Sequence, residues 1–169
     1  MKVDTNINKI DLIRLNLIIL PRLKSSYIMI LAISLFVFTY IAWTNGLPQS
    51  SKSWLNILLS SIAGGVIGLL GGFVFSMVSI LFMSTKKNGI LGIHEYTLTP
   101  EGLYEETKAN KSLNKWKGIN KVYIVSSYIL FQISGYLFHI IPKRSFESSE
   151  DFNKYATVSI KYWRNAHNK

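Results

Sequence analysis

The stretch LNILLSSIAGGVIGLLGGFVFSMVSILF, residues 55–82, contains neither a charged side chain nor a proline. The hydrocarbon core of a bilayer is about 30 Å thick and is crossed by about 20 helical residues, so this stretch is long enough to span a membrane with some tilt. We therefore predict a transmembrane helix over residues 55–82.

Three glycines recur within this stretch. Gly64, Gly68 and Gly72 are spaced four residues apart, so they share one face of the predicted helix. Repeated G-x-x-x-G steps allow a second helix to approach the backbone closely. Two partners for the glycine face stay open: the other apolar helix of the same chain, or the same helix of a second copy in a homodimer.

A second uncharged run, YIMILAISLFVFTYIAW at residues 27–43, is at the short end of what can span a bilayer. Tyr27 begins this run, Trp43 ends it, and Trp54 precedes the next one, as expected for aromatic side chains at the level of the lipid headgroups. Residues 44–54 between the runs form a short polar loop with turn-forming residues. The pattern predicts a transmembrane helical hairpin.

Residues 1–26, a basic leader, combine apolar residues at helical spacing with basic and polar residues between them. Pro21 is expected to end any helix there. Two interpretations stay open: a short amphipathic helix on the membrane surface, or a leader without defined structure.

The positions of the basic residues predict the orientation of the hairpin. Lys2, Lys9, Arg14, Arg22 and Lys24 precede the first span, Lys86 and Lys87 follow the second, and only Lys52 lies in the loop. Loops rich in Lys and Arg stay on the cytoplasmic side. We therefore expect a multi-pass protein of the bacterial inner membrane with both termini in the cytoplasm and residues 44–54 outside.

The composition narrows the function classes. The formal net charge is +10, which suits a protein whose basic residues face anionic lipid on the cytoplasmic side. There is no cysteine, which excludes disulfides, thiolate metal sites and cysteine nucleophiles. A secretory signal is disfavoured because the basic region before the first run is long and no small-x-small cleavage site follows Trp43.

After residue 87 the apolar residues alternate with a period of two, and turn residues are frequent. We predict strands over residues 92–98, 103–108, 112–116, 119–125, 128–134 and 136–141. A helix follows, with Ser148 and Asp151 as a capping box. Its apolar stripe comprises Phe152, Tyr155, Ala156, Ser159, Ile160 and Trp163. Residues 88–169 thus predict an α+β domain, a curved antiparallel sheet or half barrel closed by a C-terminal helix.

Three segments resemble the YcxB-like family of small bacterial membrane proteins: GILGIHEYTLTPEGL at 89–103, WKGINKV at 116–122 and IIPKRSF at 140–146. The resemblance covers the chain from Gly89 onward and includes the two helices ahead of the domain. It implies a cytoplasmic domain like the pleckstrin-homology (PH) domain, tethered by a helical hairpin, and it brings no catalytic residues. The chain departs from the family pattern at Ile93 and Ser145.

Enzyme signatures such as phosphate-binding glycine loops, G-x-S-x-G and H-E-x-x-H do not occur in the sequence. The histidines lack the spacing of zinc ligands, and we favour hydrogen-bonded structural roles for His94 and His139. Glu105 and Glu106 are adjacent on a predicted strand and so point to opposite faces, which we interpret as a solvated hairpin edge. We expect no enzymatic activity, no cofactor and no metal.

Lys143 and Arg144 form the most informative polar pair, because they lie where the last strand meets the helix. A guanidinium beside an ammonium suits a lipid phosphate or an acidic partner, although an ordinary exposed turn also explains the pair. With Lys115, Lys117 and Lys121 they would form a basic rim facing the bilayer.

The sequence predicts a membrane-tethered, non-enzymatic interaction module. Its PH-like domain would bind a protein partner or an anionic lipid surface, and its second span could form a homodimer. No recognised nucleic-acid-binding motif is present, so nucleic acid is not expected as a partner. The alternative is a multimeric channel or a transport accessory subunit whose seam is Gly64, Gly68 and Gly72.

Overall fold

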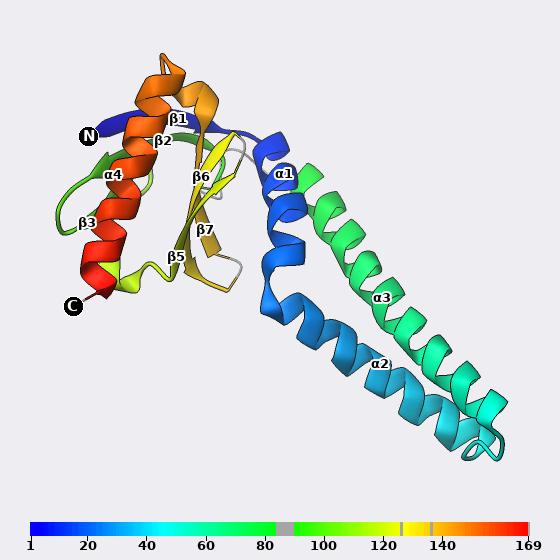
Figure 1. The fold of residues 1–169 in the computed structure, drawn as a ribbon. Helices are drawn as coiled ribbons and strands as arrows, with labels where there is room; N and C mark the ends of the chain where they lie inside the picture. The colour runs from blue at the N-terminus through cyan, green and yellow to red at the C-terminus, as the bar shows by residue number, and fades with distance from the viewer. Residues whose placement is uncertain (84–89, 126, 136, 169) are drawn as a thin grey trace. The chain divides into compact units, whose positions relative to one another are not determined.

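The computed structural model describes residues 1–83, 90–125, 127–135 and 137–168 (Figure 1). The chain divides into two compact units, one formed by Met1–Arg14 with Met83–Lys169 and the other by Leu15–Phe82. We call them the β-rich unit and the hairpin unit. Four parts of the sequence-based prediction fall outside the described residues: the basic pair Lys86 and Lys87, the start of the domain and of the resemblance at residues 88–89, Ser126 between the predicted strands 119–125 and 128–134, and Tyr136 at the start of the last predicted strand.

The hairpin unit contains the two predicted apolar helices, α2 (Lys24–Asn45) and α3 (Ser51–Leu81). Both are confirmed as helices, and both begin before the uncharged runs do. Each is long and apolar enough to cross a membrane. The Ser50 side chain caps α3 by accepting a hydrogen bond from the Ser53 backbone N–H at 3.2 Å.

Packing between α2 and α3 accounts for part of the glycine face. A methyl group at Gly64 would lie 3.0 Å from Val37, and one at Gly68 would lie 3.0 Å from Ile33. A methyl group at Gly65 would come within 2.6 Å of the Ile30 carbonyl oxygen and would collide with the side chain of the buried Ser34. The intramolecular partner for Gly64 and Gly68 is therefore α2.

A methyl group at Gly72 or at Gly71 would meet no atom of the facing helix or of any other described segment within 4 Å. The closest approach of α2 to the α3 backbone is at Gly65, the residue directly after Gly64, because the buried face of α3 passes through Ile57, Ser61 and Gly65. These three residues recur at i, i+4 and i+8 and form the actual seam with α2.

The first residues differ from the prediction. Residues 1–26 were expected to form a leader or an interfacial helix, but Lys2–Ile7 forms a strand, β1, that pairs antiparallel with β2 (Gly92–Leu98). Val3, Thr5 and Ile7 are buried and the residues between them are exposed, so the strand follows a period of two. The expected helix begins only at Lys9, as α1 (Lys9–Ile19), and the 3₁₀ turn η1 (Leu20–Arg22) contains Pro21.

Among the described residues of the β-rich unit, seven strands form two antiparallel sheets (Figure 1). The first has the order β1-β2-β3-β4, with β3 at Gly102–Thr107 and β4 at Lys111–Lys115. The second has the order β5-β6-β7, with β5 at Lys121–Val125, β6 at Tyr128–Ser134 and β7 at Leu137–Pro142. Two short 3₁₀ turns, η2 (Trp116–Gly118) and η3 (Lys143–Ser145), connect β4 to β5 and β7 to the last helix.

The last helix, α4 (Ser149–His167), covers the core of this unit. The Ser148 hydroxyl accepts a hydrogen bond from the Asp151 backbone N–H at 3.0 Å, which confirms the predicted cap. Phe152, Tyr155 and Ala156 pack with apolar side chains from both sheets, while Ile160 is only partly buried. The predicted α+β class, with two apolar helices followed by antiparallel sheets and a C-terminal helix, is confirmed.

One topological feature positions the candidate site. Ile7 of β1 pairs with Gly92 of β2, so the entire hairpin unit is inserted in the connection between two neighbouring strands of one sheet. The chain therefore leaves this sheet before the apolar helices and rejoins it afterwards.

Candidate anion-binding site

A pocket of about 290 Å³ opens where α1, the start of β6 and η3 meet in the β-rich unit. It is lined by Arg14, Ser127, Tyr128, Pro142, Lys143 and Arg144. Pairing of Tyr128 with Pro142 brings the two strand ends together, and the Lys143 N–H donates to the Ser127 carbonyl at 2.7 Å. The strand pairing thus places three basic side chains around one opening.

Arg144 is already committed to a carboxylate. Its guanidinium donates to both oxygens of Asp11, with Nη1 2.6 Å from Oδ1 and Nη2 2.5 Å from Oδ2. Nη2 also donates to the Asn6 carbonyl at 2.9 Å. The predicted lipid contact at Arg144 is therefore first of all an intramolecular fork that joins η3 to α1 and β1.

Asp11 is the buried member of this pair, with a side chain only 1% exposed. It also accepts hydrogen bonds from the Tyr128 hydroxyl at 3.0 Å and from the Asn8 backbone N–H at 2.9 Å. Burial raises the pKa of Asp11, but the hydrogen bonds from Arg144, Asn8 and Tyr128 outweigh burial and hold that pKa below its ordinary value. The carboxylate is fully satisfied and leaves no acceptor facing the pocket.

Arg14 and Lys143 are the remaining cations of the pocket, and neither forms an ion pair with any other described residue. The ammonium of Lys143 lies 5.8 Å from the centre of the Phe152 ring, a cation–π contact that leaves its hydrogen-bond donors available. Arg14 and Ser127 are exposed. Since no carboxylate lines the pocket, its positive charge is uncompensated, which suits a phosphate or carboxylate ligand.

The structure does not bring Lys115 and Lys117 to this pocket. They flank Trp116, whose ring lies 5.8 Å from Tyr162 near the end of α4, whereas Lys143 contacts Phe152 near its beginning. The ten residues from 152 to 162 correspond to about 15 Å of helix. The four candidate contact residues therefore form two separate basic regions rather than one rim.

A second polar cluster lies between β2, β3 and β7. The carboxylate of Glu105 is bonded to the His94 ring at 2.9 Å, to the Tyr96 hydroxyl at 2.8 Å and to the His139 ring at 3.3 Å. The interpretation of Glu105 as part of a solvated edge is therefore wrong. The interpretation as a solvated edge does fit Glu106, which points to the other face and pairs with Lys111 at 2.7 Å.

Burial raises the pKa of Glu105, but hydrogen bonds from His139, His94 and Tyr96 more than offset burial and place that pKa far below its ordinary value. The cluster thus contains an ionised carboxylate held by two imidazoles, in agreement with the hydrogen-bonded roles expected for His94 and His139. Within the part of the chain that the structure describes, no group of three His, Asp or Glu side chains is placed to hold a metal ion.

Several residues of the site were missed from the sequence. The sequence gives no local signal for Asp11 and Arg14, because Arg144, which pairs with Asp11, and the residues that line the pocket with Arg14 lie more than a hundred positions away in the chain. The Glu105 cluster did have a signal. The short connection between the predicted strands 92–98 and 103–108 sets a hairpin register in which Tyr96 lies directly opposite Glu105.

These features define a class: an α+β domain with a basic pocket, interrupted by a helical hairpin long and apolar enough to cross a membrane. Residues 98–158 match the family model described as YcxB-like protein, which confirms the resemblance identified from the sequence. The match includes Glu105, Lys143 and Arg144 but neither Asp11 nor Arg14. No curated protein and no solved structure matches the chain.

Proposed function

We propose that the protein is a non-enzymatic, membrane-tethered module that binds the phosphate of anionic lipid headgroups through Arg14 and Lys143. The observation that carries the proposal is the basic pocket, in which these two cations have no carboxylate partner. The segment between Arg14 and Lys24, the first residue of α2, can span at most about 36 Å. A short tether of this kind keeps the pocket near the headgroups of the membrane in which the hairpin is anchored.

Two features support placing both ends of the hairpin on the cytoplasmic side of a bacterial inner membrane. The chain leaves one sheet before the hairpin and rejoins it afterwards, because Ile7 pairs with Gly92. Two paired strands of this sheet cannot lie on opposite sides of a bilayer, so both ends of the hairpin lie on the same side. Basic residues are also concentrated outside the loop at residues 44–54. The four-stranded and three-stranded sheets with a C-terminal helix support the PH-like fold that the YcxB-like resemblance implies.

The test uses the full chain in nanodiscs, since β1 belongs to the sheet and a fragment starting at residue 88 would lack it. Hydrogen exchange of residues 127–128 and 142–146 is compared in phosphatidylglycerol and phosphatidylcholine discs. We expect slower exchange in phosphatidylglycerol for the wild-type chain, and loss of this difference in an Arg14→Glu, Lys143→Glu variant. The matched control is Lys115→Glu, Lys117→Glu, which changes the charge equally at the other end of α4.

An equal loss in the control would show that diffuse charge, not the pocket, is responsible. Absence of any lipid effect in the wild-type chain would refute lipid binding. Binding of an acidic peptide in that case would favour a protein partner.

The alternative of a multimeric channel or transport accessory draws on one observation: a methyl group at Gly71 or Gly72 would meet no atom of any other described segment within 4 Å, which leaves part of α3 open to another helix. The informative variant is Gly72→Leu, because a leucine at Gly68 would collide with Ile33 and disrupt the hairpin itself. Ion flux through liposomes that disappears in Gly72→Leu would support a pore.

A further inference from the structure

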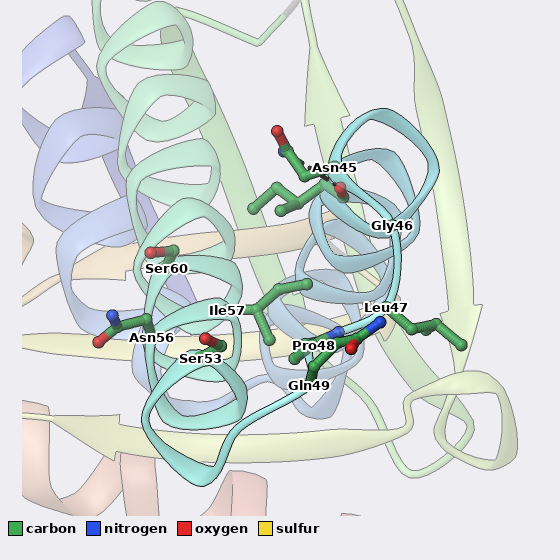
Figure 2. A pocket seen from close by; sticks show the side chains of 10 residues that line it. Asn45, Gly46, Leu47, Pro48, Gln49, Ser53, Asn56, Ile57 and Ser60 are labelled. Carbon is green, nitrogen blue, oxygen red and sulfur yellow. Dashed lines mark hydrogen bonds between the residues drawn. The ribbon is translucent and has the colours of Figure 1, made fainter.

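A second pocket, of about 480 Å³, lies at the bend of the hairpin (Figure 2). Its lining comes from the end of α2, the connecting loop and the first turns of α3. The residues are Ile41, Asn45, Gly46, Leu47, Pro48, Gln49, Ser53, Asn56, Ile57 and Ser60. The volume lies in the range of small-ligand sites. The lining contains amides, hydroxyls and apolar side chains but no charged group.

Some of these polar groups already have partners. Asn45 donates to the Ile41 carbonyl at 3.2 Å and to the Thr44 hydroxyl at 3.0 Å. Ser53 interacts with the Ser50 hydroxyl at 2.9 Å as part of the α3 cap. These bonds fix the shape of the bend.

Three lining side chains remain available, those of Gln49, Asn56 and Ser60. None of them hydrogen-bonds to another described residue of the chain. Ser53, Asn56 and Ser60 are spaced i, i+3 and i+7, so they follow one side of α3 (Figure 2). Asn56 is the carboxamide of a helix whose other uncharged polar side chains are serines, and polar side chains within membrane spans commonly mark a binding site.

The aromatic residues indicate the depth of this pocket. Trp43 is 89% exposed and Trp54 is 41% exposed, and they flank the bend on α2 and α3. Exposed tryptophans of membrane helices concentrate at the headgroup level. In the membrane placement proposed above, on which this inference rests, the pocket opens among the headgroups of the outer leaflet.

The chemistry of the lining selects a class of ligand. Carboxamides and hydroxyls each donate and accept hydrogen bonds, as the hydroxyls of a sugar or glycerol do. A phosphate would need a cation, and the lining has none. We infer that the bend of the hairpin binds a neutral polyol group, either a lipid headgroup or a soluble sugar, through Gln49, Asn56 and Ser60.

The test compares three samples of the full chain in phosphatidylcholine nanodiscs. The first has no addition, the second contains monoglucosyl diacylglycerol in the discs, and the third has free methyl glucoside in solution. Binding is read from tryptophan fluorescence and from hydrogen exchange of residues 45–53. The decisive variant exchanges Leu55 and Asn56, which preserves composition and hydropathy but moves the carboxamide by roughly 100° around the helix. We expect affinity to fall about fivefold for the one hydrogen bond lost, and further when Ser60→Ala is added.

Ser79→Ala serves as the matched control, because Ser79 lies on α3 far from the bend and bonds to the Phe75 carbonyl at 2.9 Å. Binding of the glucosyl lipid only would identify a headgroup site, and binding of methyl glucoside as well would identify a general polyol site. Binding of neither probe, or unchanged binding by the exchanged variant, would overturn the inference.

Recovery of the chain in nanodiscs is measured first. A chain that does not insert contradicts the membrane placement, whereas a chain that inserts without binding a polyol contradicts this inference alone.

Discussion

The ion pair between Asp11 and Arg144 makes the sharpest stability prediction, because its two partners differ in burial. Asp11 is 1% exposed and Arg144 is 47% exposed. In Asp11→Asn the guanidinium loses its counter-charge, but it is exposed enough to be hydrated by solvent. We therefore expect the free energy of unfolding to fall by about 1–2 kcal/mol. In Arg144→Met the carboxylate stays buried without its cation. Breaking a buried pair in this way costs about 3–5 kcal/mol, here reduced to about 2–4 kcal/mol because Tyr128 and Asn8 still donate.

Thermal unfolding of the full chain in mild detergent measures the difference, with near-ultraviolet circular dichroism reporting on Trp116 in the core of the β-rich unit. Arg144→Met should lower Tm about twice as far as Asp11→Asn, since a unit of this size loses about 4–8 °C per kcal/mol. Arg164→Met, on the exposed side of α4, is the matched control and should change Tm little. The double variant should cost less than the sum of the two single changes. A larger loss in Asp11→Asn than in Arg144→Met, or strict additivity, would refute this explanation.

Three further outcomes are expected. Glu105 has a lowered pKa in the folded state, so its ionised form stabilises the fold. This contribution is complete above the ordinary pKa of 4.5 and is lost as the pH falls below it. A Tm series from pH 6 to pH 3 should show this loss in the wild-type chain and not in Glu105→Gln. An unchanged acid-dependent loss of Tm in that variant would contradict the role of the carboxylate. Gly65→Val should separate α2 from α3, measured by cross-linking of engineered cysteines, whereas Gly72→Val should not, because of these two glycines Gly65 meets the facing helix and Gly72 does not. Equal cross-linking in both would argue against the seam. Val3→Asp should lower the Tm of the β-rich unit by more than 10 °C, because it buries an unpaired charge in the core. A Tm within a few degrees of wild type would mean that β1 is dispensable.

The elements that could be predicted are those with a complete local signal. The C-terminal helix has both a cap at Ser148 and a long apolar stripe, and β6 was predicted with the bounds that the structure shows. The apolar helices follow from length and composition. In each case the information lies within one segment.

The features that were missed depend on residues far apart in the chain. In β1 only Val3, Thr5 and Ile7 carry the alternation, and the partner strand follows the whole hairpin. The pocket likewise joins Arg14 to residues after position 126, so Lys143 and Arg144 were recognised while their neighbours were not. The sequence predicts the face of Gly64, Gly68 and Gly72 and not Gly65, because three glycines at four-residue spacing are the stronger local pattern.

The placement of the hairpin between β1 and β2 has a consequence for biosynthesis. Ile7 leaves the ribosome 85 positions before its partner Gly92, counted as 92 minus 7, which at 5–20 residues per second is roughly 4–17 s. In the membrane placement proposed above, both apolar helices would emerge during that interval and engage the insertion machinery while β1 waits unpaired. Lys2 and Asp4, which are exposed in the folded sheet, keep this waiting segment polar, and the first sheet closes only after the whole hairpin has been synthesised.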